Sequence, residues 1–144
     1  MHCVETEIEI HASAERVWAL LTDFASYPRW NPFVRSIECE LLVGQNLSVF
    51  IQPPGSGGMR FRPSLLTVSP GRELRWKGKL LLPGVFDGEH YFKLEAAPNT
   101  GVLFRQGERF TGLLVPRFRK SLNGATKRGF IAMNEALKRE AEGA

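Results

Sequence analysis

Two alternating runs joined by a short turn decide the fold: VFDGEHYFKLEA (residues 85–96) and VLFRQGERFTG (residues 102–112), with PNTG between them. In a β-strand, successive side chains point to opposite faces. One face of the first run carries Phe86, His90 and Phe92, whereas the opposite face is mostly charged. The short Pro/Asn/Gly turn favours antiparallel neighbours. The stretch therefore predicts a hairpin whose apolar face includes a histidine.

The second run supplies that histidine with a partner. Its apolar face also carries Gln106 and Glu108. His90 and Glu108 lie equally far from the middle of the turn, at position 99, which predicts that they face each other across the hairpin. An isolated buried carboxylate is costly, and a histidine partner reduces that cost by pairing or by sharing a proton.

Three interpretations of the His90–Glu108 pair remain open. It is a hydrogen-bonded core pair that fixes the strand register, or a polar anchor that orients a ligand carbonyl or hydroxyl among aromatic side chains. The third interpretation is general acid/base catalysis by His90, with Glu108 setting its tautomer and charge. No nucleophile, oxyanion loop or metal motif accompanies the pair, so the spacing does not choose among them.

Five further runs upstream read as strands and end at turns rich in Gly, Pro or Asn. They cover residues 4–11, 33–42, 46–52, 59–68 and 73–81. A helix capped by Ser13 follows the first strand. The prolines of YPRWNP (residues 27–32) allow only a turn or a very short helix after it. The chain is thus predicted to contain seven strands and one or two short helices.

The last segment, from about Val115 to Ala141, reads as one long amphipathic helix. Gly124 and Gly129 weaken its interior, but they also allow the close approach of the sheet or of a bound molecule. The order of strand, short helices, six strands and long helix indicates an α+β fold. An antiparallel sheet has one apolar face to cover, and this helix is the only element large enough to cover it.

The composition of the chain limits the kinds of function that it can have. The 144 residues suit a single domain, 1–144, with 43% hydrophobic and 24% charged residues. We find no apolar run long enough for stable membrane insertion, no secretory signal and no nucleic-acid motif, so a cytoplasmic protein is expected. The net charge is +4, and the run 116–128 holds five basic residues and no acidic one. The oligomeric state stays open.

The stretch VWALLTDFASYPRWNPFV (residues 17–34) resembles the N-terminal signature of the START-like superfamily. More narrowly, it resembles the polyketide cyclase/dehydratase and lipid-transport group, often labelled SRPBCC. The matching residues are Val17, Trp18, Asp23, Tyr27, Trp30, Asn31 and Pro32. The segments LRWKG, LPGVFDGEHYFKLE and ERFTGLLVP, and the closing helix, are also similar to the group's bacterial single-domain members.

This resemblance implies a helix-grip fold, in which a seven-stranded antiparallel sheet wraps the C-terminal helix and leaves a deep apolar cavity. The chain lacks the Cys/His pattern of a Rieske or other metal site, so neither a metal nor a cofactor is expected. The expected ligand-binding residues are Trp30, Phe61, Trp76, His90, Phe92, Phe104, Glu108, Phe110, Phe130 and Met133.

Because this fold hosts many functions, three hypotheses stay open. The first is a carrier or sensor of a small hydrophobic molecule, such as a lipid or a polyketide-like aromatic. The second is a cyclase- or dehydratase-like enzyme that uses His90 and Glu108 as its acid/base pair. The third is a module that contacts a protein or membrane surface through the basic helix face at 117–128.

Overall fold

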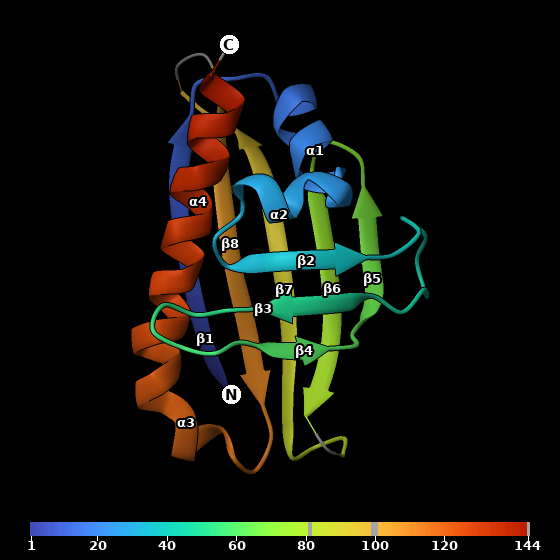
Figure 1. Cartoon of the computed structure of the whole chain (residues 1–144), viewed down its shortest axis with the longest axis vertical. Coiled ribbons are helices and arrows are strands. Elements are labelled where there is room, and N and C mark those ends of the chain that lie inside the picture. Colours follow the sequence, from blue (N-terminus) through green and yellow to red (C-terminus); the bar gives the residue numbers. More distant parts are fainter. Residues whose placement is uncertain (81, 99–100, 144) are drawn as a thin grey trace.

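Two antiparallel sheets and a long C-terminal helix make up the computed structural model, which describes residues 1–80, 82–98 and 101–143 (Figure 1). One sheet comprises β1 (His2–Ile10), β8 (Val102–Thr111), β7 (Phe86–Ala96), β6 (Glu73–Leu80) and β5 (Ser64–Ser69), in that order. The other comprises β2 (Val34–Glu38), β3 (Ser48–Ile51) and β4 (Met59–Phe61). The predicted strand end at Leu81 and the turn residues Asn99 and Thr100 lie outside the described residues.

The prediction of seven strands in one sheet is wrong, because the run 59–68 forms two strands in different sheets. Pro63 lies between β4 and β5. It has no amide hydrogen for a ladder, and it restricts the backbone of the residue before it. Its carbonyl instead accepts a hydrogen bond from the Leu47 amide at 2.8 Å. The chain therefore passes from one sheet to the other at this proline.

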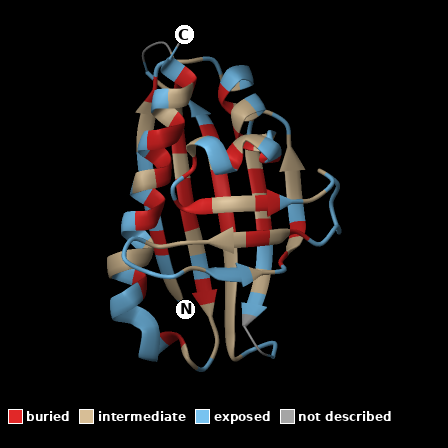
Figure 2. Ribbon diagram, in the orientation of Figure 1, coloured by how far each residue is buried: buried red, intermediate tan, exposed pale blue. Residues whose placement is uncertain are grey.

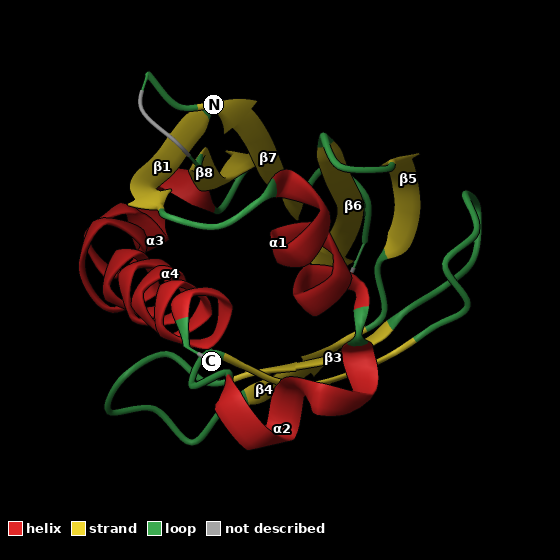
Figure 3. Cartoon of the chain, turned by 90° about the horizontal axis from the view of Figure 1, so that it is seen from above, coloured by secondary structure: helices red, strands yellow, loops and turns green. Residues whose placement is uncertain are grey.

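Short helices follow the first strand, as predicted. They are α1 (Ala14–Thr22), a 3₁₀ turn (Phe24–Ser26) and α2 (Tyr27–Trp30). The Ser13 hydroxyl accepts a hydrogen bond from the Arg16 amide at 3.1 Å and so caps α1. Seen from above, α1 lies between α4 and β6, and α2 lies beside the three-stranded sheet (Figure 3).

The C-terminal helix is interrupted by a π-helical segment that the sequence did not predict. The helix consists of α3 (Val115–Ser121), the π-helical segment (Leu122–Thr126) and α4 (Lys127–Glu142). Short π segments within α-helices occur frequently at functional sites. The predicted close approach is confirmed at Gly129, where an added Cβ would collide with the Phe33 ring. At Gly124 the sheet does not approach closely, because an added Cβ would meet only the Arg128 guanidinium, at 3.6 Å, and the approach of a bound molecule there stays a prediction.

The core lies between α4 and the concave face of the five-stranded sheet. Buried positions line the inner faces of β1, β7, β8 and α4 (Figure 2). The buried α4 residues include Phe130, Met133 and Leu137. The arrangement is an α+β fold with a long helix packed on an antiparallel sheet, consistent with the expected helix grip. Within the described residues, no helix is both long and apolar enough to span a bilayer.

Candidate functional site

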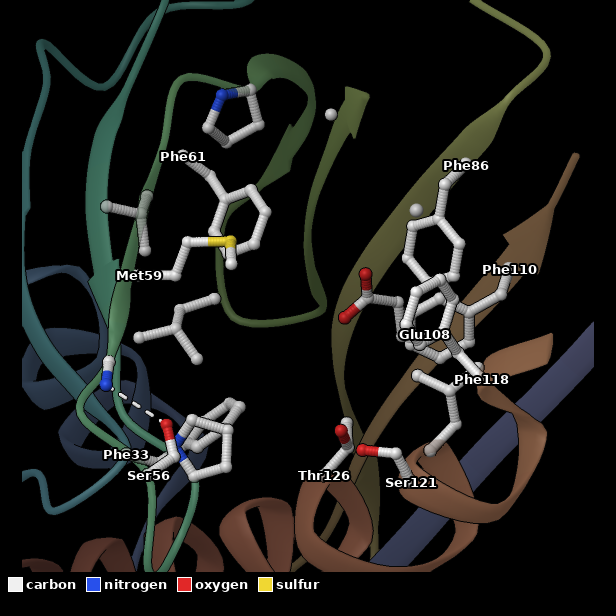
Figure 4. Close-up of a pocket in the computed structure, with 18 of the residues that line it drawn as sticks. Phe33, Ser56, Met59, Phe61, Phe86, Glu108, Phe110, Phe118, Ser121 and Thr126 are labelled. Atoms are coloured by element: carbon white, nitrogen blue, oxygen red, sulfur yellow. Dashed lines mark hydrogen bonds between the residues drawn. The ribbon is translucent and has the colours of Figure 1, made fainter. Parts of the chain in front are cut away.

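A cavity of about 290 Å³ opens between the two sheets and the first half of the C-terminal helix (Figure 4). Its walls are mostly aromatic and aliphatic. In Figure 4, Phe33, Met59 and Phe61 lie on one side, and Phe86, Phe110 and Phe118 lie on the other. The remaining lining residues are Val49, Ile51, Pro53, Ser56, Gly58, Pro63, Trp76, Gly78, Lys79, Gly88, Glu108, Ser121, Leu122 and Thr126. The volume is at the small end of the roughly 300–1,000 Å³ of typical ligand pockets.

Two glycines hollow the sheet beneath the cavity. Gly78 of β6 and Gly88 of β7 are directly opposite each other in the ladder. Because neither has a side chain, the sheet surface is recessed where both residues face the cavity. A Cβ added to Gly88 would fall well within 3.0 Å of Oε2 of Glu108. The sheet therefore leaves room both for a ligand and for one carboxylate.

The predicted pairing of His90 and Glu108 is confirmed. The two residues are opposite each other in the β7–β8 ladder, and Nδ1 of His90 lies 2.8 Å from Oε1 of Glu108. The His90 side chain is 2% exposed, whereas the Glu108 side chain is 18% exposed and lines the cavity. Of the two, only Glu108 lines the cavity.

Aromatic rings enclose the His90 imidazole on the core side. The Trp76 ring stacks on it with centroids 5.3 Å apart and an angle of 14° between the planes. Phe130 meets it edge-on at 5.0 Å, and the Phe92 ring lies 4.8 Å away. His90 thus marks the boundary between packed core and open cavity.

The cavity contains four of the ten expected ligand-binding residues, namely Phe61, Trp76, Glu108 and Phe110. Six others do not line it: Trp30, His90, Phe92, Phe104, Phe130 and Met133. Trp30 is partly buried, and the other five are buried in the core. A direct contact of these six with a ligand stays a prediction.

Several lining residues were missed as ligand contacts, although the sequence held a signal for some. Phe86 shares the face of His90 by alternation, and Phe118 belongs to the apolar stripe of the C-terminal helix. Gly78 and Gly88 were a further signal, because glycine within a strand often indicates that a ligand or another backbone segment approaches the sheet closely. No sequence signal indicated the π-helical segment, which brings Leu122 and Thr126 to the cavity wall.

Outside the cavity, two features bear on chemistry. The five basic side chains at 117–128 (Arg117, Arg119, Lys120, Lys127 and Arg128) are all exposed, and their contact with an acidic surface stays a prediction. Within residues 1–80, 82–98 and 101–143, no cluster of three or more His, Cys, Asp or Glu side chains is placed to hold a metal ion.

The only two tyrosines of the chain lie away from the cavity. Burial, with a smaller effect of Asp23, raises the pKa of Tyr27 above its ordinary value. Burial also raises the pKa of Tyr91, and a hydrogen bond from its hydroxyl to the Glu5 carboxylate adds to the shift. Both phenols therefore serve structure as neutral hydrogen-bond donors.

Comparison with known proteins identifies the family. The profile of the family described as Polyketide cyclase / dehydrase and lipid transport matches residues 1–142. No curated protein sequence matches the chain at a significant level.

Among solved structures, protein MLL2253 from Mesorhizobium loti is 23% identical, with 96% of this chain and 95% of that chain covered and a TM-score of 0.74. The Zhui aromatase/cyclase from Streptomyces sp. R1128 is 18% identical, with 98% and 93% covered and a TM-score of 0.77. The di-domain ARO/CYC StfQ from the steffimycin biosynthetic pathway is 15% identical, with a TM-score of 0.76; 97% of this chain aligns with 50% of that one. At these identities the likeness shows a shared fold.

Proposed function

Because this chain belongs to the polyketide cyclase/dehydrase and lipid transport family, we propose that its cavity binds a small hydrophobic molecule, as a carrier or sensor. The observation that carries the proposal is the cavity itself. Its walls are mostly aromatic and aliphatic, and one carboxylate, that of Glu108, lies over the recessed sheet. Pockets that bind small molecules combine such walls with a few placed polar groups.

The size and shape of the cavity favour a compact ligand. Its volume of about 290 Å³ suits a small fused-ring aromatic better than a lipid with two acyl chains. Facing phenylalanine rings, such as Phe33 and Phe61 on one side and Phe86 and Phe110 on the other, provide surfaces for aromatic contacts. A polyketide-like aromatic is therefore the ligand class that the lining supports best.

A matched pair of helix variants tests this proposal. Thr126→Phe places a ring in the cavity, whereas Ile131→Phe adds the same ring at a position of α4 that is 40% exposed and does not line the cavity. Naphthalene and related aromatics should raise the melting temperature of the wild type and of Ile131→Phe, because a ligand that binds only the folded state stabilises it. They should leave Thr126→Phe unshifted. Equal shifts in both variants, or no shift with a broad aromatic and lipid library, would contradict the proposal.

A second candidate is acid/base catalysis on a polyketide-like substrate. The observation that favours it is the Glu108–His90 pair, in which a cavity-facing carboxylate is hydrogen bonded to an imidazole. Here His90→Ala should abolish turnover and leave ligand affinity largely intact. Equal loss of turnover and affinity would favour the role of a ligand anchor.

A third candidate is association with an anionic membrane surface through the basic residues at 117–128. The exposed apolar side chains of Leu113 and Phe118 beside these cations favour it. Association with anionic vesicles should then weaken as salt rises. Binding that is unchanged in the double variant Arg119→Glu/Lys120→Glu would exclude this candidate.

A further inference from the structure

Glu108 divides its two carboxylate oxygens between the core and the cavity. Oε1 faces Nδ1 of His90 at 2.8 Å. Oε2 lies over Gly88, at the cavity wall. Among the described residues, no group forms a hydrogen bond with Oε2. Oε2 of Glu108 is therefore a polar atom of the cavity wall that is available to a ligand, beside the hydroxyl-bearing side chains of Ser56, Ser121 and Thr126.

A buried chain of hydrogen bonds continues behind His90 and has a fixed direction. The Thr6 hydroxyl donates to the backbone carbonyl of Gln106 at 3.0 Å, so its oxygen accepts from Nδ2 of Asn134 at 2.8 Å. Oδ1 of Asn134 then accepts from Nε2 of Gln106 at 2.8 Å. The same Nε2 also donates to the Phe130 carbonyl at 3.3 Å. Two backbone carbonyls thus fix the orientation of both amides.

This orientation determines the proton on His90. Oε1 of Gln106 is left facing Nε2 of His90 at 3.0 Å, and an amide oxygen only accepts hydrogen bonds. Nε2 must therefore carry a hydrogen. A second proton must then lie between Nδ1 and Oε1 of Glu108, because two lone pairs at 2.8 Å would repel each other. The pair is either imidazolium with carboxylate or imidazole with carboxylic acid, and it has no net charge.

In either state Oε2 of Glu108 is a hydrogen-bond acceptor. The other charged residue of the lining, Lys79, is exposed and alternates with the inward-facing Gly78 and Trp76 along β6, so it does not neutralise Oε2. We infer that the cavity selects an uncharged aromatic with one alcohol or phenol hydroxyl, which donates to Oε2 of Glu108. Thr6, Gln106 and Asn134 act as positioning residues that maintain this acceptor. The inference rests on the proposed function.

Four ligands of similar size test the inference: 2-naphthol, 2-methoxynaphthalene, naphthalene and 2-naphthoate. Only 2-naphthol combines a hydroxyl donor with no charge at neutral pH. It should bind the wild type about tenfold or more tightly than 2-methoxynaphthalene, and tenfold corresponds to about 1.4 kcal/mol. The affinity for 2-naphthoate should be the lowest of the four, because its carboxylate brings a second acceptor to Oε2. Titration calorimetry measures all four.

Two substitutions at one position provide the matched control. Glu108→Gln keeps an acceptor oxygen toward the cavity, because its amide nitrogen can donate to Nδ1 of His90 in place of the shared proton. Glu108→Leu removes the acceptor. The preference for 2-naphthol over 2-methoxynaphthalene should persist in Glu108→Gln and vanish in Glu108→Leu, with naphthalene affinity reporting whether each variant keeps its cavity.

The proton positions are measured directly by long-range ¹H–¹⁵N correlation spectra of the His90 ring. Nε2 should be protonated in the wild type at neutral pH, and Asn134→Leu should release that constraint. An unprotonated Nε2, or equal affinity for 2-naphthol and 2-methoxynaphthalene while both bind, would overturn the inference and leave the proposed function standing. Failure of all four ligands to bind would overturn both.

Discussion

Replacing Gly88 by alanine tests the arrangement at the cavity wall through a single methyl group. The backbone at Gly88 is not left-handed, so alanine is tolerated there and by itself stabilises by about 0.4–1 kcal/mol, through the unfolded state. The new Cβ, however, would lie well within 3.0 Å of Oε2 of Glu108 and 3.2 Å from its Cδ. The carboxylate must move, and we expect this movement to break the hydrogen bond between its Oε1 and His90.

The expected magnitude follows from these two effects. A hydrogen bond to a charged group contributes about 1.5–3 kcal/mol, so Gly88→Ala should lower the free energy of unfolding by a net of about 1–2 kcal/mol. At about 2–4 °C per kcal/mol for a chain of this size, the melting temperature should fall by roughly 2–8 °C. The control is Gly57→Ala, where an added Cβ has nothing within 4 Å.

A double-mutant cycle isolates the cause. In the Glu108→Ala background no carboxylate stands in the way, so Gly88→Ala should be neutral or slightly stabilising. The coupling energy between positions 88 and 108 should be about 1.5–3 kcal/mol. Urea unfolding of the four proteins measures it. If Gly88→Ala costs the same in both backgrounds, the collision with Glu108 is not what destabilises the protein, and the reasoning is refuted.

Two further predictions concern residues outside the cavity. Because the pKa values of Tyr27 and Tyr91 are raised, an alkaline ultraviolet titration should show no phenolate in the folded protein near pH 10, the ordinary tyrosine pKa. The unfolded chain then loses protons first, so stability should fall as the pH rises above about 10; phenolate absorbance in the folded protein at that pH would contradict this. Oδ1 of Asn31 accepts hydrogen bonds from the amides of Phe33 and Val34 at 3.0 and 2.9 Å in a fully buried site. Asn31→Ala should therefore cost about 1–3 kcal/mol in thermal or urea unfolding, and a cost below 0.5 kcal/mol would show that the two amides find other partners.

Alternation and turn length predicted the pairing of His90 with Glu108, because a short turn fixes the register of a hairpin. The same signals wrongly predicted one continuous strand across Pro63. The alternation of side chains continues through this residue, but the hydrogen-bond ladder between strands does not. The Pro63 carbonyl accepts a hydrogen bond from the Leu47 amide, a tertiary contact that strand periodicity does not predict.

Alternation also predicts which face a side chain occupies, but not how that face is divided along the strand. Phe92 and Phe104 share the face of Glu108 and Phe110, yet they lie in the half that is packed as core. The half that stays open is the one with Gly78 and Gly88. The sequence was therefore sufficient to locate the candidate site on one face of one hairpin. The extent of the site could be defined only from the positions of β3, β4 and the π-helical segment in the structure.

The three methionines test the central claim, that the cavity binds an aromatic ligand, in a single experiment. Met59 lines the cavity, Met133 is fully buried in the core beyond it, and Met1 is at the exposed N-terminus. The measurement is a titration of protein labelled with ¹³C at the methionine methyl groups with 2-naphthol, followed by NMR. The Met59 methyl signal should shift and saturate while the Met1 signal stays in place, and the Met133 signal reports whether the ligand also contacts the core. An unchanged Met59 signal at saturating ligand, or equal shifts of all three, would contradict the account.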